Sequence, residues 1–164
     1  MRTYDLLDEA VIPAPPTTVW SHLVDELSGA RRWWVPYNTF EVRSGAPDQM
    51  GGEVQWTVHT RGVGRGGPKI RFLSRTTSVT PGTHLELAYV SGAFHGSAEF
   101  SLEPVGDGAR TRLGLRFQAR PRGWVRLLAG LAPVDQEHSR AAHAAFAALA
   151  TLLAAEQDHL ERSQ

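Results

Sequence analysis

From Val134 to about Glu161, the sequence reads as one long amphipathic helix. Its apolar residues recur every three or four positions, which is typical of a helix that packs on one side. The stripe consists of Ala142, Ala145, Phe146, Leu149, Leu152 and Leu153. At 1.5 Å per residue this helix is about 40 Å long. It is the only element large enough to cover a sheet, so the rest of the fold has to pack around it.

The segments before this helix alternate between apolar and polar residues, as expected when one side of an antiparallel sheet is covered. Strands are predicted over Tyr4–Ile12, Thr39–Ser44, Glu53–Thr60, Lys69–Thr80, His84–Ser91, Phe94–Glu103 and Ala109–Ala119. A short helix is predicted over Thr17–Leu27, a further helical turn at ARRWW, and a turn or helix over Trp124–Leu131, closed by Pro133. The chain shows no repeat or low-complexity linker, so residues 1–164 are expected to form one α+β domain.

The alanines of the stripe fill less volume than leucines would. A slim helix on a curved sheet would leave a cavity between the two, although alanine also permits close packing. The sequence therefore raises the hypothesis of an internal cavity.

One hairpin allows its register to be predicted. If Asp107 and Gly108 form a two-residue type I′ turn, which that dipeptide favours, the residues of the two flanking strands pair in a fixed order. The predicted pairs are Glu103 with Arg112, Ser101 with Gly114, Glu99 with Arg116, Leu102 with Leu113 and Phe100 with Leu115. Opposite charges then meet on one face and apolar residues on the other, whereas a slip of one residue would mix the faces.

Charge and composition exclude several classes of protein. Lys and Arg number 17, as do Asp and Glu, so there is no basic excess of the kind that a nucleic-acid binder shows. The arginines of the last strand are interpreted as a solvated face with acidic partners across the ladder. No cysteine is present, which excludes disulfides and thiolate metal sites. The amino-terminal residues lack the apolar core of a secretory signal, and no apolar run is long enough to span a membrane. We therefore expect a cytoplasmic protein without stable membrane insertion, as a monomer or homodimer.

Short motifs add little chemistry. Gly62, Gly64 and Gly67 match the letters of the dinucleotide-binding fingerprint, but a proline and a strand follow where that fingerprint needs a helix. The seven histidines are scattered, and none has the spacing and acidic partner of a metal site. No serine lies in a nucleophile elbow. No cofactor and no metal are therefore expected.

Three segments together resemble the START-like, birch-pollen-allergen-like superfamily, and within it the bacterial polyketide cyclase/dehydrase-like proteins. These segments are VIPAPPTTVWSHLVD, ARRWWVPY and SGAFHGSAEFSLEPVGDGARTRLGLRF, and their order spans nearly the whole chain. The resemblance implies a helix-grip fold: a curved seven-stranded antiparallel sheet around a long C-terminal helix, with two short helices between the first two strands. It also implies a cavity for an apolar or polycyclic ligand. Members include aromatase/cyclases and lipid carriers, so the fold leaves the function open.

The strand Lys69–Thr80 is the most informative for a site. A tight turn at Pro81 and Gly82 would place Ser74 opposite Tyr89 on the apolar side, amid aromatic residues. This mixture suits an aromatic ligand that carries carbonyls or hydroxyls, and equally a core whose hydroxyls bond to the backbone. The ligand-binding candidates are Trp34, Tyr37, Trp56, Phe72, Ser74, Tyr89, Phe94 and Phe146.

Two functions follow from this pattern. The first is the binding of a small hydrophobic, polycyclic or aromatic molecule, and the second is a polyketide cyclase/aromatase or dehydratase activity in the same cavity. Such a reaction needs orientation and one acid or base, for which Arg75, Tyr89 and His95 are the candidates. Arg75 would turn inward only if a bulge shifted its strand. An interaction module is the third alternative, and the clean alternation of the strands argues against it.

The segment RRWWVPY is expected to form one wall of the cavity. Adjacent residues on a helical turn point about 100° apart, so one tryptophan should face the core and the other the cavity. Trp34 with Tyr37 is predicted to line the ligand and Trp33 to pack, while Arg31 and Arg32 are predicted to be solvated.

Overall fold

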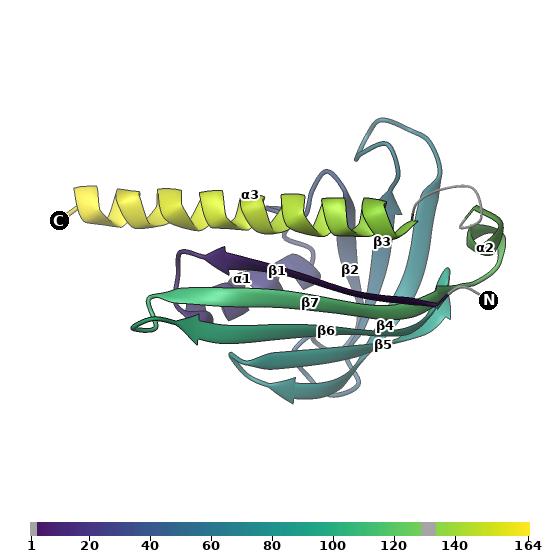
Figure 1. Cartoon of the computed structure of the whole chain (residues 1–164), viewed down its shortest axis with the longest axis horizontal. Helices are drawn as coiled ribbons and strands as arrows, with labels where there is room; N and C mark the ends of the chain where they lie inside the picture. The colour runs from purple at the N-terminus through teal and green to yellow at the C-terminus, as the bar shows by residue number, and fades with distance from the viewer. Residues whose placement is uncertain (1–2, 129–133) are drawn as a thin grey trace.

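The computed structural model describes residues 3–128 and 134–164 and contains one curved sheet with the long C-terminal helix on its concave side (Figure 1). The strands are β1 (Tyr4–Ile12), β2 (Asn38–Ser44), β3 (Glu53–His59), β4 (Lys69–Thr80), β5 (His84–Gly92), β6 (Phe94–Val105) and β7 (Arg110–Pro121). The helices are α1 (Pro16–Leu27), α2 (Trp124–Leu128) and α3 (Val134–Arg162). All strand pairs are antiparallel, in the order β1-β7-β6-β5-β4-β3-β2. The predicted helix-grip fold is confirmed.

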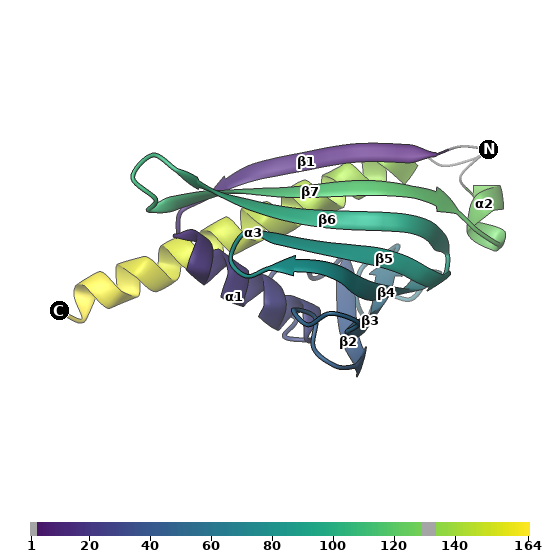
Figure 2. The ribbon, with the colours of Figure 1, turned by 90° about the horizontal axis from the view of Figure 1, so that it is seen from below.

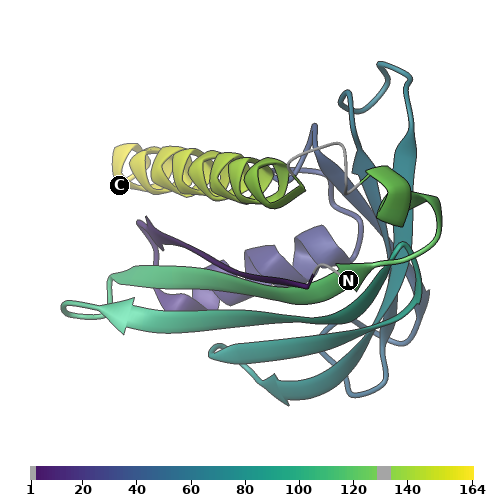
Figure 3. The ribbon, with the colours of Figure 1, turned by 45° about the vertical axis from the view of Figure 1, so that its right-hand side comes forward.

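The sheet bends so that β2 and β3 rise towards α3, while β1, β7 and β6 run beneath it (Figure 3). Among the strands, β1 is the one on which the backbone of α3 packs most extensively. Large side chains therefore fill the distance between α3 and the middle of the sheet. Residues 129–131 of the predicted helix after β7, and Pro133 that was expected to close it, lie outside the described residues.

The first helix forms as predicted. Pro16 stands at its first turn, where a missing N–H is tolerated, and Val19, Leu23 and Leu27 are buried. Gly29 ends it with a φ of 104°. The Gly29 N–H donates to the Glu26 carbonyl at 3.0 Å and the Ala30 N–H to the Asp25 carbonyl at 3.1 Å. This pair of bonds is a Schellman motif, which requires a left-handed residue that glycine adopts without strain.

The predicted helical turn at ARRWW is wrong, because α1 is the only helix within residues 13–37, all of which the structure describes. Arg31 has a φ of 54°, which no helix accommodates. The next three backbone N–H groups, of Arg32, Trp33 and Trp34, donate to the buried carboxylate of Glu26. The backbone of this segment is thus held by a side chain of the preceding helix and not by helical hydrogen bonds of its own.

The β6–β7 hairpin has the predicted register. Glu103 faces Arg112, Ser101 faces Gly114, and the pairs Glu99–Arg116, Leu102–Leu113 and Phe100–Leu115 also occur. The predicted two-residue type I′ turn is wrong, because the strands end at Val105 and Arg110. Gly106 and Gly108 have positive φ values of 64° and 88°, whereas a type I′ turn would need Asp107 in that region. A loop of residues 106–109 therefore gives the same register as the predicted two-residue turn.

The pairing of Ser74 with Tyr89 is also confirmed, by a less direct route than predicted. Pro81 and Gly82 form a turn closed by the Thr83 N–H and the Thr80 carbonyl at 3.0 Å, and Gly82 has a φ of 77°, as a type II turn requires. Thr80 then pairs with His84, one residue away from the tight-turn register. A bulge between Thr76 and Ser78 restores the offset.

Candidate ligand-binding site

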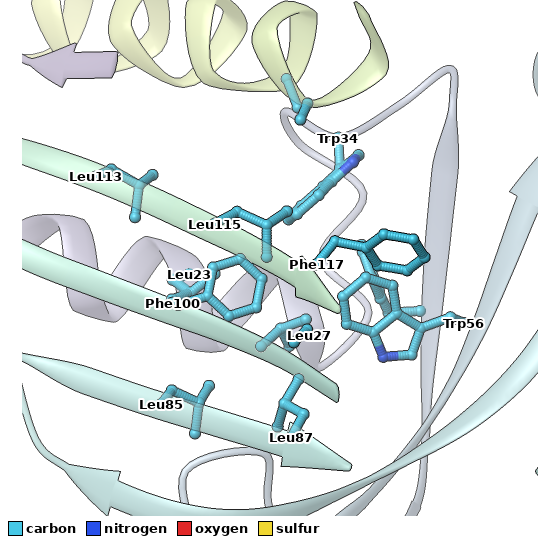
Figure 4. Close-up of a cluster of buried hydrophobic side chains, with 14 of the residues drawn as sticks. Leu23, Leu27, Trp34, Trp56, Leu85, Leu87, Phe100, Leu113, Leu115 and Phe117 are labelled. Atoms are coloured by element: carbon cyan, nitrogen blue, oxygen red, sulfur yellow. The ribbon is translucent and has the colours of Figure 1, made fainter. Parts of the chain in front are cut away.

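Aromatic side chains from β2, β3, β4, β5, β6, β7, α3 and the RRWW segment meet on the concave face of the sheet. Trp34 lies at the centre, with ring centroids 5.3 Å from Phe40, 5.9 Å from Trp56 and 6.2 Å from Phe146. Figure 4 shows Trp34 beneath α3. We call this set the aromatic cluster: Trp34, Phe40, Trp56, Phe72, Tyr89, Phe94, Phe100, Phe117 and Phe146. Six of the eight ligand-binding candidates belong to it.

The two tryptophans of the RRWW segment are both buried and stack on each other, with centroids 5.2 Å apart. The Trp33 indole N–H donates to the His22 carbonyl of α1 at 3.3 Å, so Trp33 packs as predicted. Tyr37 is partly buried against the core. Arg31 and Arg32 are exposed, and Arg32 Nη2 lies 2.9 Å from Glu156 Oε1 of α3. The segment therefore connects α1, the aromatic cluster and α3.

Ser74 uses its hydroxyl within the protein. The Trp56 indole N–H donates to Ser74 Oγ at 3.0 Å, and Ser74 Oγ donates to the Val54 carbonyl at 3.4 Å. Thr76 Oγ1 likewise donates to the Pro47 carbonyl at 2.7 Å. These hydroxyls hold neighbouring strands and loops together, which is the second of the two interpretations that the sequence left open.

Two of the three catalytic candidates lie on the outer face of the sheet. Arg75 has 52% of its side chain exposed and pairs with Glu53 at 2.8 Å. His95 is exposed opposite Arg120. The alternative in which a bulge turns Arg75 inward is therefore wrong: the shifts on either side of it leave Arg75 opposite Ala88, on the solvent side. Tyr89 is the one of the three that faces the interior.

Tyr89 and His138 flank Phe117 at one end of the aromatic cluster. The ring centroid of Phe117 lies 5.9 Å from Tyr89 and 4.4 Å from His138, which stacks on it at 25°. Burial raises the pKa of the Tyr89 hydroxyl far above its usual value, so the phenol stays protonated. Burial lowers the pKa of His138 to about 4, and the nearby Asp8 carboxylate opposes this shift only in part. At neutral pH, the imidazole of His138 is therefore uncharged.

His138 Nε2 is buried and has no hydrogen-bond partner. Its distance to Asp8 Oδ2 is 3.9 Å, beyond hydrogen-bonding reach. Among the hydrogen bonds of the described residues, none involves the Tyr89 hydroxyl. This end of the cluster therefore combines apolar ring faces with polar atoms that the protein itself leaves unused.

A buried carboxylate anchors α3 beside this end. Asp8 of β1 is 4% exposed, accepts a hydrogen bond from Ser139 Oγ at 3.2 Å, and has His143 Nε2 3.1 Å from its Oδ1. The sequence reasoning missed both Asp8 and His138. The signal was present, because Asp8 is in phase with Tyr4 and Ile12 on β1, and His138 precedes Ala142 by four positions on the α3 stripe. The described residues hold no group of three or more His, Cys, Asp or Glu side chains arranged for a metal ion.

A comparison with known protein families finds one that matches most of the chain. Residues 6–154 match the family described as "Polyketide cyclase / dehydrase and lipid transport". The chain belongs to this family. No match is found among curated protein sequences. Within the described part of this family member, no helix is long and apolar enough to cross a membrane.

Solved structures show the same fold at low identity. TTHA0849 from Thermus thermophilus superposes with a TM-score of 0.68 and 21% identity, covering 93% of this chain and 99% of that one. The Zhui aromatase/cyclase from Streptomyces sp. R1128 gives 0.58 and 20%, covering 74% of this family member and 70% of the cyclase. A START superfamily protein from Mycobacterium smegmatis gives 0.58 and 15%, covering 85% and 96%. These likenesses show that this family member shares its fold with the three proteins.

Proposed function

We propose that the protein binds a small, largely apolar molecule, aromatic or polycyclic, between the sheet and α3. The molecule sits against Phe117 and offers at least one hydrogen-bonding group to His138 or Tyr89. Binding requires no metal, no cofactor and no nucleic acid. The protein acts in the cytoplasm as a monomer or homodimer. The family description, which includes lipid transport, supports an apolar ligand.

The observation that carries this proposal is the unpartnered Nε2 of His138. A buried polar atom without a partner destabilises a fold by about 1–3 kcal/mol, so folded proteins retain few of them. Here the atom borders apolar rings, which is the composition of a small-molecule site: apolar walls for affinity and a few polar groups for orientation. A ligand hydroxyl or carbonyl would complete the hydrogen bonding of His138.

Titration calorimetry with 2-naphthol and naphthalene tests this proposal, because the two probes differ by one hydroxyl. We expect the wild-type protein to bind both, and 2-naphthol about fivefold to tenfold more tightly, the value of one hydrogen bond. The preference for 2-naphthol should be lost in His138→Phe, which keeps an aromatic ring on Phe117, or in Tyr89→Phe. His159→Phe, at an exposed position on the same helix, is the matched control and should keep the preference.

Two outcomes would contradict the proposal. If neither probe binds to protein whose circular dichroism is native, the aromatic cluster is a closed core. If the preference for 2-naphthol survives in His138→Phe and in Tyr89→Phe, these two residues do not orient the ligand.

A cyclase/aromatase or dehydratase activity is the second candidate. It is favoured by the position of an imidazole and a phenol on either side of Phe117, because the phenol can donate a hydrogen bond to a carbonyl of a bound chain while the imidazole accepts one. Turnover of a poly-β-ketone mimic should then be lost in His138→Phe and Tyr89→Phe. Arg75→Ala should leave turnover unchanged, since Arg75 is exposed on the other face of the sheet. Absence of turnover by the wild-type protein would refute this second candidate and leave ligand binding intact.

A further inference from the structure

A basic and apolar surface surrounds α2, at the end of the molecule opposite the β6–β7 turn (Figure 2). Arg120, Arg122 and Arg126, together with Pro121 and Gly123, line a hollow of about 320 Å³. Trp124 and Leu127 project from α2 beside them, 50% and 76% exposed. We call Arg120, Arg122, Trp124, Arg126 and Leu127 the α2 patch.

The charge of the α2 patch is not neutralised within the protein. Arg112 and Arg116, earlier on β7, pair with acidic side chains of neighbouring strands. No ion pair forms on the three arginines of the patch across residues 3–128 and 134–164. The sequence from Gly108 to Val134 contains no Asp or Glu, so the segment outside the described residues adds no acid either. Three cationic groups are therefore available to an external anionic partner.

The apolar part of the patch is unusual for this protein. Of the six large apolar side chains left exposed among the described residues, two belong to this five-residue helix. Trp124 and Leu127 are three positions apart and so lie on one side of α2. Val125 is 1% exposed and packs in the core, so the side of α2 that carries Trp124 and Leu127 faces solvent. The exposure is thus built into the packing of α2.

We propose that the α2 patch docks the protein on the surface of a bilayer that contains anionic phospholipids. Arginines bind lipid phosphates, and a tryptophan with a leucine between them suits the boundary between headgroups and acyl chains. Trp124 and Leu127 do not line the hollow and are exposed outside it. This favours a deformable lipid surface over an acidic protein. The docking is peripheral, and it does not depend on the interior ligand proposed above.

Tryptophan fluorescence provides a specific measurement. The other four tryptophans of the chain are at most 8% exposed, so Trp124 is the only one that can move from water into lipid. On adding vesicles of phosphatidylcholine with 30% phosphatidylglycerol, we expect co-sedimentation, a blue shift of emission, and quenching by doxyl-labelled lipid. Vesicles of phosphatidylcholine alone should bind at least tenfold more weakly. High salt should weaken the binding to anionic vesicles, because it screens the arginines.

Two pairs of substitutions separate the patch from general charge. Arg122→Glu with Arg126→Glu should reduce binding to anionic vesicles by about thirtyfold or more, because one basic residue near such a surface changes binding about fivefold. Arg43→Glu with Arg110→Glu changes the net charge equally at exposed sites outside the patch and should bind like wild type. Trp124→Ser with Leu127→Ser should also lose binding while keeping all charges.

The proposal is overturned if the wild-type protein fails to bind anionic vesicles, which would leave an acidic protein as the partner class for these arginines. It is also overturned if the two arginine pairs weaken binding equally. Native circular dichroism of each variant confirms that it is folded, as expected for substitutions of exposed side chains.

Discussion

Replacement of Glu26 by alanine should destabilise the protein more than any surface change of similar size. Glu26 is 1% exposed, and its carboxylate accepts three backbone N–H groups, of Arg32 at 2.8 Å, Trp33 at 3.2 Å and Trp34 at 2.7 Å. A hydrogen bond to a charged group contributes about 1.5–3 kcal/mol, and a buried donor without a partner costs about 1–3 kcal/mol. Because Arg32 can turn to water, two donors remain stranded, and the expected loss is about 3–5 kcal/mol.

This loss is a large fraction of the stability of a typical domain, which is about 5–15 kcal/mol. Urea unfolding followed by far-UV circular dichroism measures the loss. Near-UV circular dichroism reports the stacked rings of Trp33 and Trp34, which should lose their fixed geometry first. Glu26→Gln keeps the shape but only one acceptor oxygen, so it should lie between wild type and alanine.

The control for this prediction is Glu41→Ala. The Glu41 side chain is 69% exposed and 3.6 Å from Arg43, an arrangement that contributes about 0–1 kcal/mol. If Glu26→Ala loses less than about 1 kcal/mol, or no more than this control, the carboxylate does not organise the tryptophan segment and our account of it is wrong.

Three further predictions concern single positions. Gly96→Ala should lower the free energy of unfolding by about 2 kcal/mol or more in urea titrations. Gly96 has a φ of 145°, and a Cβ there would lie 2.1 Å from the Gln118 carbonyl oxygen. A loss under about 0.5 kcal/mol would contradict this prediction. Ser74→Ala should lower the free energy of unfolding by about 1–3 kcal/mol, because it leaves the buried Trp56 indole N–H without its acceptor. A thermal unfolding midpoint equal to that of the wild-type protein would argue against this prediction. The folded pKa of His138, about 4, lies below its unfolded value near 6.5, so the unfolded state binds this proton first. Stability should therefore fall by up to about 3 kcal/mol as the pH falls from about 6.5 to 4. His138→Phe should show a correspondingly shallower decline when urea unfolding is repeated across that range, and an unchanged slope would refute the assignment.

The strands and the long helix could be predicted because their patterns are local. A strand covered on one face alternates with a period of two, and a helix that packs on one side repeats every three to four residues. The pairing of Glu99 with Arg116 and of Phe100 with Leu115 followed from an assumed two-residue turn at Asp107 and Gly108, and a slip of one residue would have mixed charged and apolar faces. The turn type was less determined, because a four-residue loop with Gly106 and Gly108 serves the same register.

The site could be predicted only in part. Alternation placed Trp56, Phe72, Tyr89 and Phe94 correctly on the covered face. It could not show that the Trp56 indole N–H donates to the Ser74 hydroxyl, because that contact depends on how two separate strands pair in space.

The sequence by itself determined which face of each element is covered. It also determined that strands joined by a hairpin lie next to each other in the sheet, and that thiolate chemistry is absent. Each of these follows from residue types at short spacing. Only the tertiary structure decided which buried polar atoms are satisfied. Glu26 takes the donors of a segment that local pattern assigns to a helix, and Asp8 meets Ser139 across a separation of 131 positions. Periodicity describes neighbours along the chain, whereas hydrogen bonds between distant segments depend on packing that no short stretch of sequence encodes.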